Sequence, residues 1–90
     1  MKRILNKAIK HYGKENQIGI AQEEAAELIQ SLSKSRRGLD HNVFEEIADV
    51  EIMLEQLKII FNCANEVKEW KKYKLNRLNE RIKNITKMSK

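Results

Sequence analysis

Apolar residues recur at helical spacing through nearly the whole chain, and no proline interrupts them. Residues three and four positions apart share one face of an α-helix, so this spacing predicts amphipathic helices. No stretch shows the sustained alternation of apolar and polar residues that is typical of a strand. A domain of 90 residues has only a marginally sufficient core of its own. The sequence therefore predicts an all-α fold: a helical bundle with a central antiparallel helix pair, completed by oligomerisation.

We expect one helical domain over residues 1–90, because no linker, repeat or low-complexity segment divides the chain. Its expected parts are a short N-terminal helix at 1–13, an acidic helical hairpin at 15–62 and a basic C-terminal helix at 66–86. Gly13 and Gly38 mark expected helix ends, since glycine readily adopts the left-handed conformation that often follows a helix.

Two further positions concern the local structure of the hairpin. Asn42 and Glu45 have the three-residue spacing of a capping box and predict the start of the second hairpin helix. Gly19 lies inside the first hairpin helix, where glycine is unfavourable. It indicates either a later start of that helix or a close backbone approach, and the sequence does not decide between them.

Four carboxylates form two pairs on the expected hairpin. The pairs are Glu24 with Glu27 and Glu46 with Asp49. Each pair lies on one helix face and borders an apolar stripe, and burying a carboxylate there is costly without a compensating cation. Two such helices packed antiparallel would bring all four together, and oxygen ligands without a His or Cys cluster favour Mg²⁺ or Mn²⁺ over Zn²⁺. The alternative is that these are solvated acidic positions on amphipathic helices.

Charge is distributed unevenly along the chain. Residues 1–14 carry a net charge of +5, residues 15–55 carry −7, and residues 56–90 carry +7. An acidic centre between basic ends suits a site for a metal and a polyphosphate, because carboxylates hold the cation while lysine and arginine hold the anion. A nucleic-acid binder more often has an unopposed basic face, so nucleic acid is not an expected partner.

The C-terminal helix has an apolar stripe with basic residues along its border. The expected packing residues are Val67, Leu75, Leu78, Ile82 and Ile85. Lys74 and Arg77 lie at the border, where they could contact phosphate oxygens. Their alternative role is that of an ordinary solvated basic face, with long side chains that cover apolar neighbours.

These motifs resemble the all-α nucleoside triphosphate pyrophosphohydrolases of the MazG-like group, particularly short members from phages and Firmicutes. The resemblance lies in QIGIAQEEAAEL at 17–28 and EEIADVEIML at 45–54. These segments contain an EExxE motif and, after an 18-residue gap, an ExxD motif. The segment KLNRL at 74–78 is similar to the basic helix of the family, although that motif is less specific.

The resemblance implies a Mg²⁺-dependent hydrolase, with Mn²⁺ as a possible substitute, that cleaves a nucleoside or deoxynucleoside triphosphate to the monophosphate and pyrophosphate. By the same resemblance, the metal ligands would be Glu24, Glu27, Glu46 and Asp49. Glu24 and Glu27 are the candidates for the catalytic base. Gln17 would contact the base or sugar of the substrate, and Lys74 and Arg77 would contact its phosphates. No residue indicates which nucleobase is preferred.

The main alternative function is a non-catalytic helical oligomerisation and interaction module, in which acidic and basic segments pair between subunits. In either case we expect a homodimer or homotetramer. The sequence has no signal-peptide pattern and no apolar run long enough to span a membrane, which favours a cytoplasmic protein without a membrane partner.

Overall fold

The computed structural model describes residues 1–88, which form four α-helices. The helices are α1 (Lys2–Tyr12), α2 (Lys14–Arg36), α3 (Val43–Ile60) and α4 (Ala64–Met88). No strand occurs within these residues, so the prediction of an all-α fold is confirmed. In addition, none of the described helices is long and apolar enough to cross a membrane.

Residues with positive φ end the first three helices. Gly13 (φ 92°) follows α1 and Gly38 (φ 73°) follows α2, both where the sequence predicts a helix end. Beyond Gly38, the backbone N–H of Leu39 donates to the carbonyl of Lys34 at 2.9 Å, which satisfies a carbonyl that the end of α2 leaves free. Asn62 (φ 50°) ends α3 with the same pattern of backbone hydrogen bonds.

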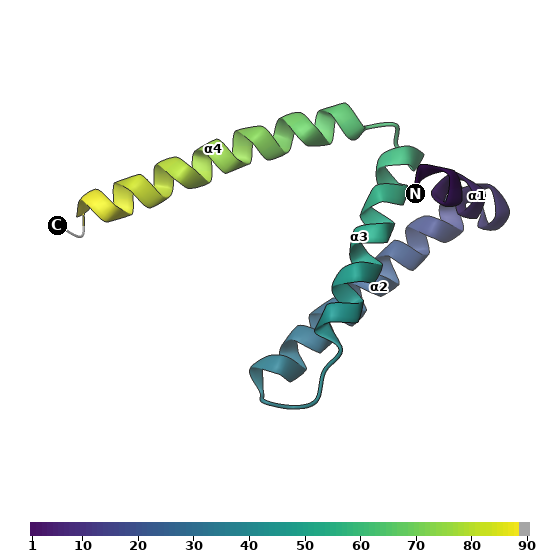
Figure 1. Ribbon diagram of the computed structural model, residues 1–90, viewed down its shortest axis with the longest axis horizontal. Helices are drawn as coiled ribbons and strands as arrows, with labels where there is room; N and C mark the ends of the chain where they lie inside the picture. The colour runs from purple at the N-terminus through teal and green to yellow at the C-terminus, as the bar shows by residue number, and fades with distance from the viewer. Residues whose placement is uncertain (89–90) are drawn as a thin grey trace.

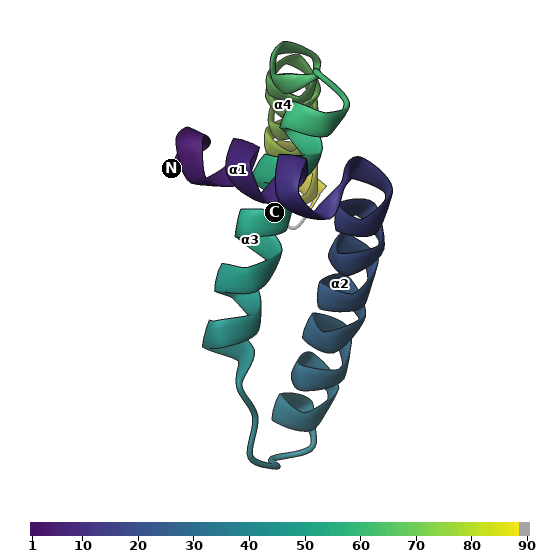
Figure 2. The ribbon, with the colours of Figure 1, turned by 90° about the vertical axis from the view of Figure 1, so that its right-hand side faces the viewer.

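The helices α2 and α3 lie side by side and run in opposite directions, joined by the loop at 37–42 (Figures 1 and 2). At the other end of this hairpin, α1 lies across both helices and contacts each of them (Figure 2). The buried apolar residues are Leu5, Ile9, Val43 and Met53. This apolar core is small, and the buried residues also include Gln17, Ser31, Glu46 and Gln56.

Two local predictions for the hairpin are corrected by the structure. Asn42 is the N-cap residue of α3, but its side chain makes no capping hydrogen bond, so the predicted capping box with Glu45 is wrong. The reason is that Ser31 and Glu46 engage the Asn42 side chain instead. Gly19 lies within α2, and a Cβ at this position would meet no atom within 4 Å, so neither of the two explanations for this glycine holds within this chain.

The long helix α4 extends away from the hairpin (Figure 1). Among the described helices it contacts only α3. The four C-terminal members of its expected packing stripe are between 49% and 63% exposed: Leu75, Leu78, Ile82 and Ile85. Most of the apolar stripe of this 25-residue helix is therefore exposed in the described part of the chain.

A candidate metal centre between α2 and α3

Three of the four predicted carboxylates meet at one point between α2 and α3. Glu24 comes from α2, whereas Glu46 and Asp49 come from α3, and one carboxylate oxygen of each lies within 4.8 Å of the other two. The spacing of three residues on α3 directs Glu46 and Asp49 to the same side, and the antiparallel packing brings α2 opposite them. The sequence predicts this convergence from spacing alone.

The carboxylate cluster of Glu24, Glu46 and Asp49 is partly buried and incompletely satisfied. Glu46 is only 6% exposed. One oxygen of Glu46 and one of Glu24, Oε2 in both residues, are buried without a hydrogen-bond partner in the described part of the chain. Buried polar atoms in folded proteins are nearly always paired, so these two acceptors could take a proton or bind a cation.

The electrostatic environment disfavours the charged form of two members of the cluster. Loss of solvent raises the pKa of Glu24, the negative charges of Glu27, Asp49 and Glu46 raise it further, and so does a side-chain hydrogen bond with Glu27. Loss of solvent also raises the pKa of Glu46, as do the charges of Glu27 and Asp49, whereas the hydrogen bond from Asn42 lowers it. The causes of the two shifts include no lysine or arginine of the described chain.

Glu27, the fourth predicted carboxylate, lies at the rim of the cluster. Its charge acts on both Glu24 and Glu46, but its oxygens are not among those that converge. The Glu27 side chain is exposed, unlike Glu46. It is therefore close enough to affect the electrostatics of the cluster and is accessible to solvent.

Gln17 lies at the end of the hairpin opposite the loop, in a buried contact between α2 and α3. Its Nε2 donates a hydrogen bond of 2.7 Å to Oε1 of Gln56, and Gln17 is 4% exposed. It precedes Glu24 by seven residues, so both lie on the same face of α2. The contact with a base or sugar that the resemblance implies for Gln17 stays a prediction.

Ser31 and Asn42 extend the polar contacts around the cluster, although the sequence motifs do not point to them. The hydroxyl of Ser31 donates to Oδ1 of Asn42 at 3.1 Å, and Nδ2 of Asn42 donates to Oε1 of Glu46 at 2.8 Å. A signal for Ser31 was present, because Gln17, Glu24 and Ser31 follow one another at intervals of seven residues. This interval places all three on the face of α2 that meets α3.

The structure does not bring Lys74 and Arg77 to the carboxylate cluster. Both lie on α4, which has no contact with α2 in the described chain. Instead, Nζ of Lys74 lies 5.8 Å from the ring centre of Trp70, and the Arg77 guanidinium lies 5.8 Å from that of Tyr73. Their predicted role in phosphate binding is therefore not provided by the single chain.

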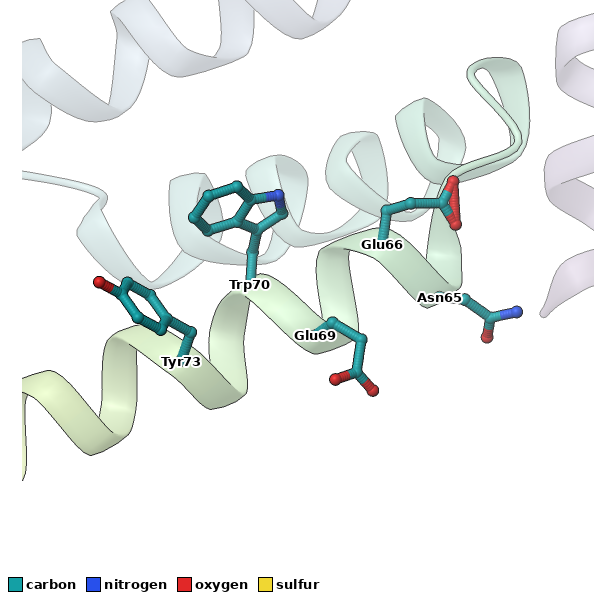
Figure 3. A pocket seen from close by; sticks show the side chains of 5 residues that line it. All are labelled: Asn65, Glu66, Glu69, Trp70 and Tyr73. Atoms are coloured by element: carbon teal, nitrogen blue, oxygen red, sulfur yellow. The ribbon is translucent and has the colours of Figure 1, made fainter.

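The aromatic rings beside these cations line a shallow hollow on α4 (Figure 3). Its lining residues are Asn65, Glu66, Glu69, Trp70 and Tyr73. All five come from one helix face, and the two rings stand edge to face with their centres 5.9 Å apart. The hollow is an open surface of α4 and is separate from the carboxylate cluster on α2 and α3.

Comparison of the chain with known protein families, characterised proteins and solved structures finds no match. The functional argument therefore depends on the chemistry of the residues themselves. The cluster offers only carboxylate oxygens, which is the ligand type that Mg²⁺ and Mn²⁺ prefer.

Proposed function

We propose that this chain is a Mg²⁺-dependent nucleoside triphosphate pyrophosphohydrolase. The proposal is supported above all by one observation: Glu24, Glu46 and Asp49 converge, and Oε2 of Glu24 and of Glu46 are buried without partners. This arrangement is costly for a protein that binds no cation, and it suits one that holds a divalent ion. The similarity to the EExxE and ExxD motifs supplies the reaction class.

In this proposal the carboxylate cluster holds Mg²⁺, which Mn²⁺ can replace, and Glu27 completes the ligand set from the rim. A bound divalent ion would polarise the α-phosphoryl group and lower the pKa of an attacking water. The water oxygen forms a bond to the α phosphorus while the bond from that phosphorus to the α–β bridging oxygen breaks. Pyrophosphate leaves with the bridging oxygen, and the nucleoside monophosphate keeps the new one.

The proton of the attacking water passes to a nearby carboxylate. Glu24 and Glu27 are the candidates for this base, and Glu27 is the more accessible of the two because its side chain is exposed. Glu46 is held by Asn42 and is more deeply buried, which suits a ligand better than a base.

The phosphate-binding residues are supplied by a second copy of the chain. The exposed apolar stripe of α4 needs a partner, and the −7 charge of residues 15–55 complements the +7 charge of residues 56–90. In a homodimer or homotetramer, α4 of one copy can lie along the hairpin of another and bring Lys74 and Arg77 to the phosphates. We place this activity in the cytoplasm, where nucleotides and Mg²⁺ are available.

The second candidate function is a helical oligomerisation module without catalysis, which the exposed apolar stripe of α4 also favours. The two candidates differ in their response to metal. An enzyme gains thermal stability from Mg²⁺ or Mn²⁺ with nucleotide, because these ligands bind the folded state preferentially. A module without a site responds to ionic strength alone.

The decisive experiment is incubation with Mg²⁺ and a panel of nucleoside and deoxynucleoside triphosphates, followed by separation of the products. We expect monophosphate and pyrophosphate. Glu46→Gln and Asp49→Asn should abolish the reaction without loss of helical circular dichroism, whereas Glu51→Gln, an exposed position on the same helix, should retain it. Products that contain orthophosphate and a diphosphate, or no products at all, would contradict the proposal.

A further inference from the structure

A chain of hydrogen bonds leads from the closed end of the hairpin to the carboxylate cluster. The Ser31 hydroxyl accepts from the backbone N–H of Asn42 at 3.2 Å and donates to Oδ1 of Asn42 at 3.1 Å. The Asn42 amide then donates from Nδ2 to Oε1 of Glu46 at 2.8 Å. The chain therefore joins α2, the loop and α3, and it ends on a carboxylate of the candidate metal centre.

The orientation of the Asn42 amide is determined by its two neighbours. The Ser31 hydroxyl has one hydrogen to donate, and a side-chain oxygen of Asn42 accepts it, so the NH₂ group must point to Glu46. Ser31 is 2% exposed, so it is shielded from competing water. An asparagine at a helix N-cap ordinarily uses its oxygen to accept a backbone N–H, but this one makes no such bond.

The two oxygens of Glu46 therefore have different environments. Oε1 is held by Asn42, and Oε2 is buried without a partner. The negative charges of Glu27 and Asp49 disfavour the charged form of this carboxylate, whereas the Asn42 hydrogen bond favours it. Without that donor, no other side-chain hydrogen bond within residues 1–88 holds Glu46 in place.

We infer that Ser31 and Asn42 are positioning residues that hold Glu46 so that its free oxygen can ligate a divalent cation. This inference deepens the proposed function and depends on its metal site. Ser31 fixes the Asn42 amide, and Asn42 fixes the Glu46 carboxylate before any ion arrives. Removal of residues that support metal ligands in this way typically lowers metal affinity by roughly 10- to 100-fold.

The test measures Mn²⁺ binding to the nucleotide-free protein by electron paramagnetic resonance, well below the unfolding temperature. In Asn42→Ser, a good N-cap residue remains, but its side chain is too short to reach Glu46. Ser31→Ala removes the hydroxyl in a helix position that alanine suits. Ser33→Ala is the matched control, because Ser33 is exposed on the same helix.

We expect Asn42→Ser to weaken Mn²⁺ binding about tenfold or more. Ser31→Ala should weaken it less but in the same direction, and Ser33→Ala should bind as the wild type does. The Mg²⁺ concentration for half-maximal hydrolysis should rise in the same order while kcat at saturating Mg²⁺ changes little. A purely structural role would lower the unfolding temperature and leave both quantities unchanged.

The outcomes also separate this inference from the proposed function. Wild-type Mn²⁺ affinity in Asn42→Ser, together with its loss in Glu46→Gln, would overturn the positioning role and leave the metal site standing. Failure of the wild-type chain both to bind Mn²⁺ and to hydrolyse any triphosphate would overturn the proposed function, and the inference with it.

Discussion

The side-chain amide of Gln17 donates a 2.7 Å hydrogen bond to the side-chain oxygen of Gln56, 39 residues away in the sequence. Both residues are 4% exposed, and Oε1 of Gln17 has no partner in the described part of the chain. The contact therefore ties α2 to α3 through polar groups that water does not reach.

Replacing one glutamine of this pair should lower the free energy of unfolding, and replacing both should lower it much less. In Gln56→Leu, the buried amide donor of Gln17 loses its acceptor, which should lower the free energy of unfolding by about 1–3 kcal/mol. The double change Gln17→Leu and Gln56→Leu should recover most of the loss, since no polar group is then left unpaired. Urea unfolding at one fixed protein concentration measures both effects. Equal losses in the single and double variants would show that the hydrogen bond contributes little.

Gly19→Ala should stabilise the chain. Alanine favours the helix over glycine by about 0.5–1 kcal/mol, and the added Cβ meets nothing within 4 Å. Thermal unfolding should show a higher midpoint for the variant than for the wild type. A lower midpoint would instead mean that a second copy packs closely against this position, which size-exclusion chromatography of the variant would then reveal as dissociation.

The free energy of unfolding in the presence of a chelator should fall as the pH rises. Burial and neighbouring charges raise the folded-state pKa of Glu24 and Glu46, whereas in the unfolded chain both pKa values are about 4.3. Between these values the folded state binds more protons than the unfolded state, so their stabilising contribution is full below about 4.3 and is lost as the pH rises through the raised pKa.

Chemical unfolding from about pH 4 to about pH 8 measures this dependence. The control is Glu24→Gln, which lacks one of the shifted carboxyls and should show a weaker decline. A decline of equal slope in both proteins would place the effect on other groups. Addition of Mn²⁺ at the upper end of the range should restore stability in the wild type more than in the variant.

Mixing two inactive variants should restore activity if α4 acts on a neighbouring copy. One variant is Glu46→Gln, which keeps the phosphate-binding residues, and the other combines Lys74→Ala with Arg77→Ala, which keeps the carboxylates. After unfolding and refolding together, a mixed oligomer contains some sites with both parts intact. Product analysis of the mixture against each variant alone gives the answer. An inactive mixture would contradict the supply of Lys74 and Arg77 by a second copy.

The part of the site that the sequence predicts is the part determined by local geometry. Glu46 and Asp49 share a helix face because of their spacing, and the glycine at position 38 turns the chain so that Glu24 comes opposite them. Three of the four predicted carboxylates therefore converge as expected. Glu27 lies at the rim because the rotation of α2 about its axis depends on how the two helices pack.

The remaining differences arise from contacts between distant residues. The spacing of Asn42 and Glu45 is the same whether Asn42 caps α3 or binds elsewhere, and the outcome depends on Ser31, eleven positions earlier. The place of α4 could not be predicted because, among the described residues, the helix contacts only α3 and its apolar stripe stays largely exposed. The apolar periodicity of α4 predicts an amphipathic helix but carries no information on what its apolar face packs against.

The hairpin is fastened on either side of the carboxylate cluster, by Gln17 with Gln56 toward α1 and by Ser31 with Asn42 toward the loop. Between these two contacts the carboxylates of α2 and α3 face one another, and the described side chains form no hydrogen bond there that joins the two helices. The levels on either side of the cluster are joined by hydrogen bonds, whereas the level of the cluster is joined by packing alone. The stability of the hairpin at this level therefore changes with the protonation of these carboxyls, or with a cation that they bind, and not with hydrogen bonds between the helices.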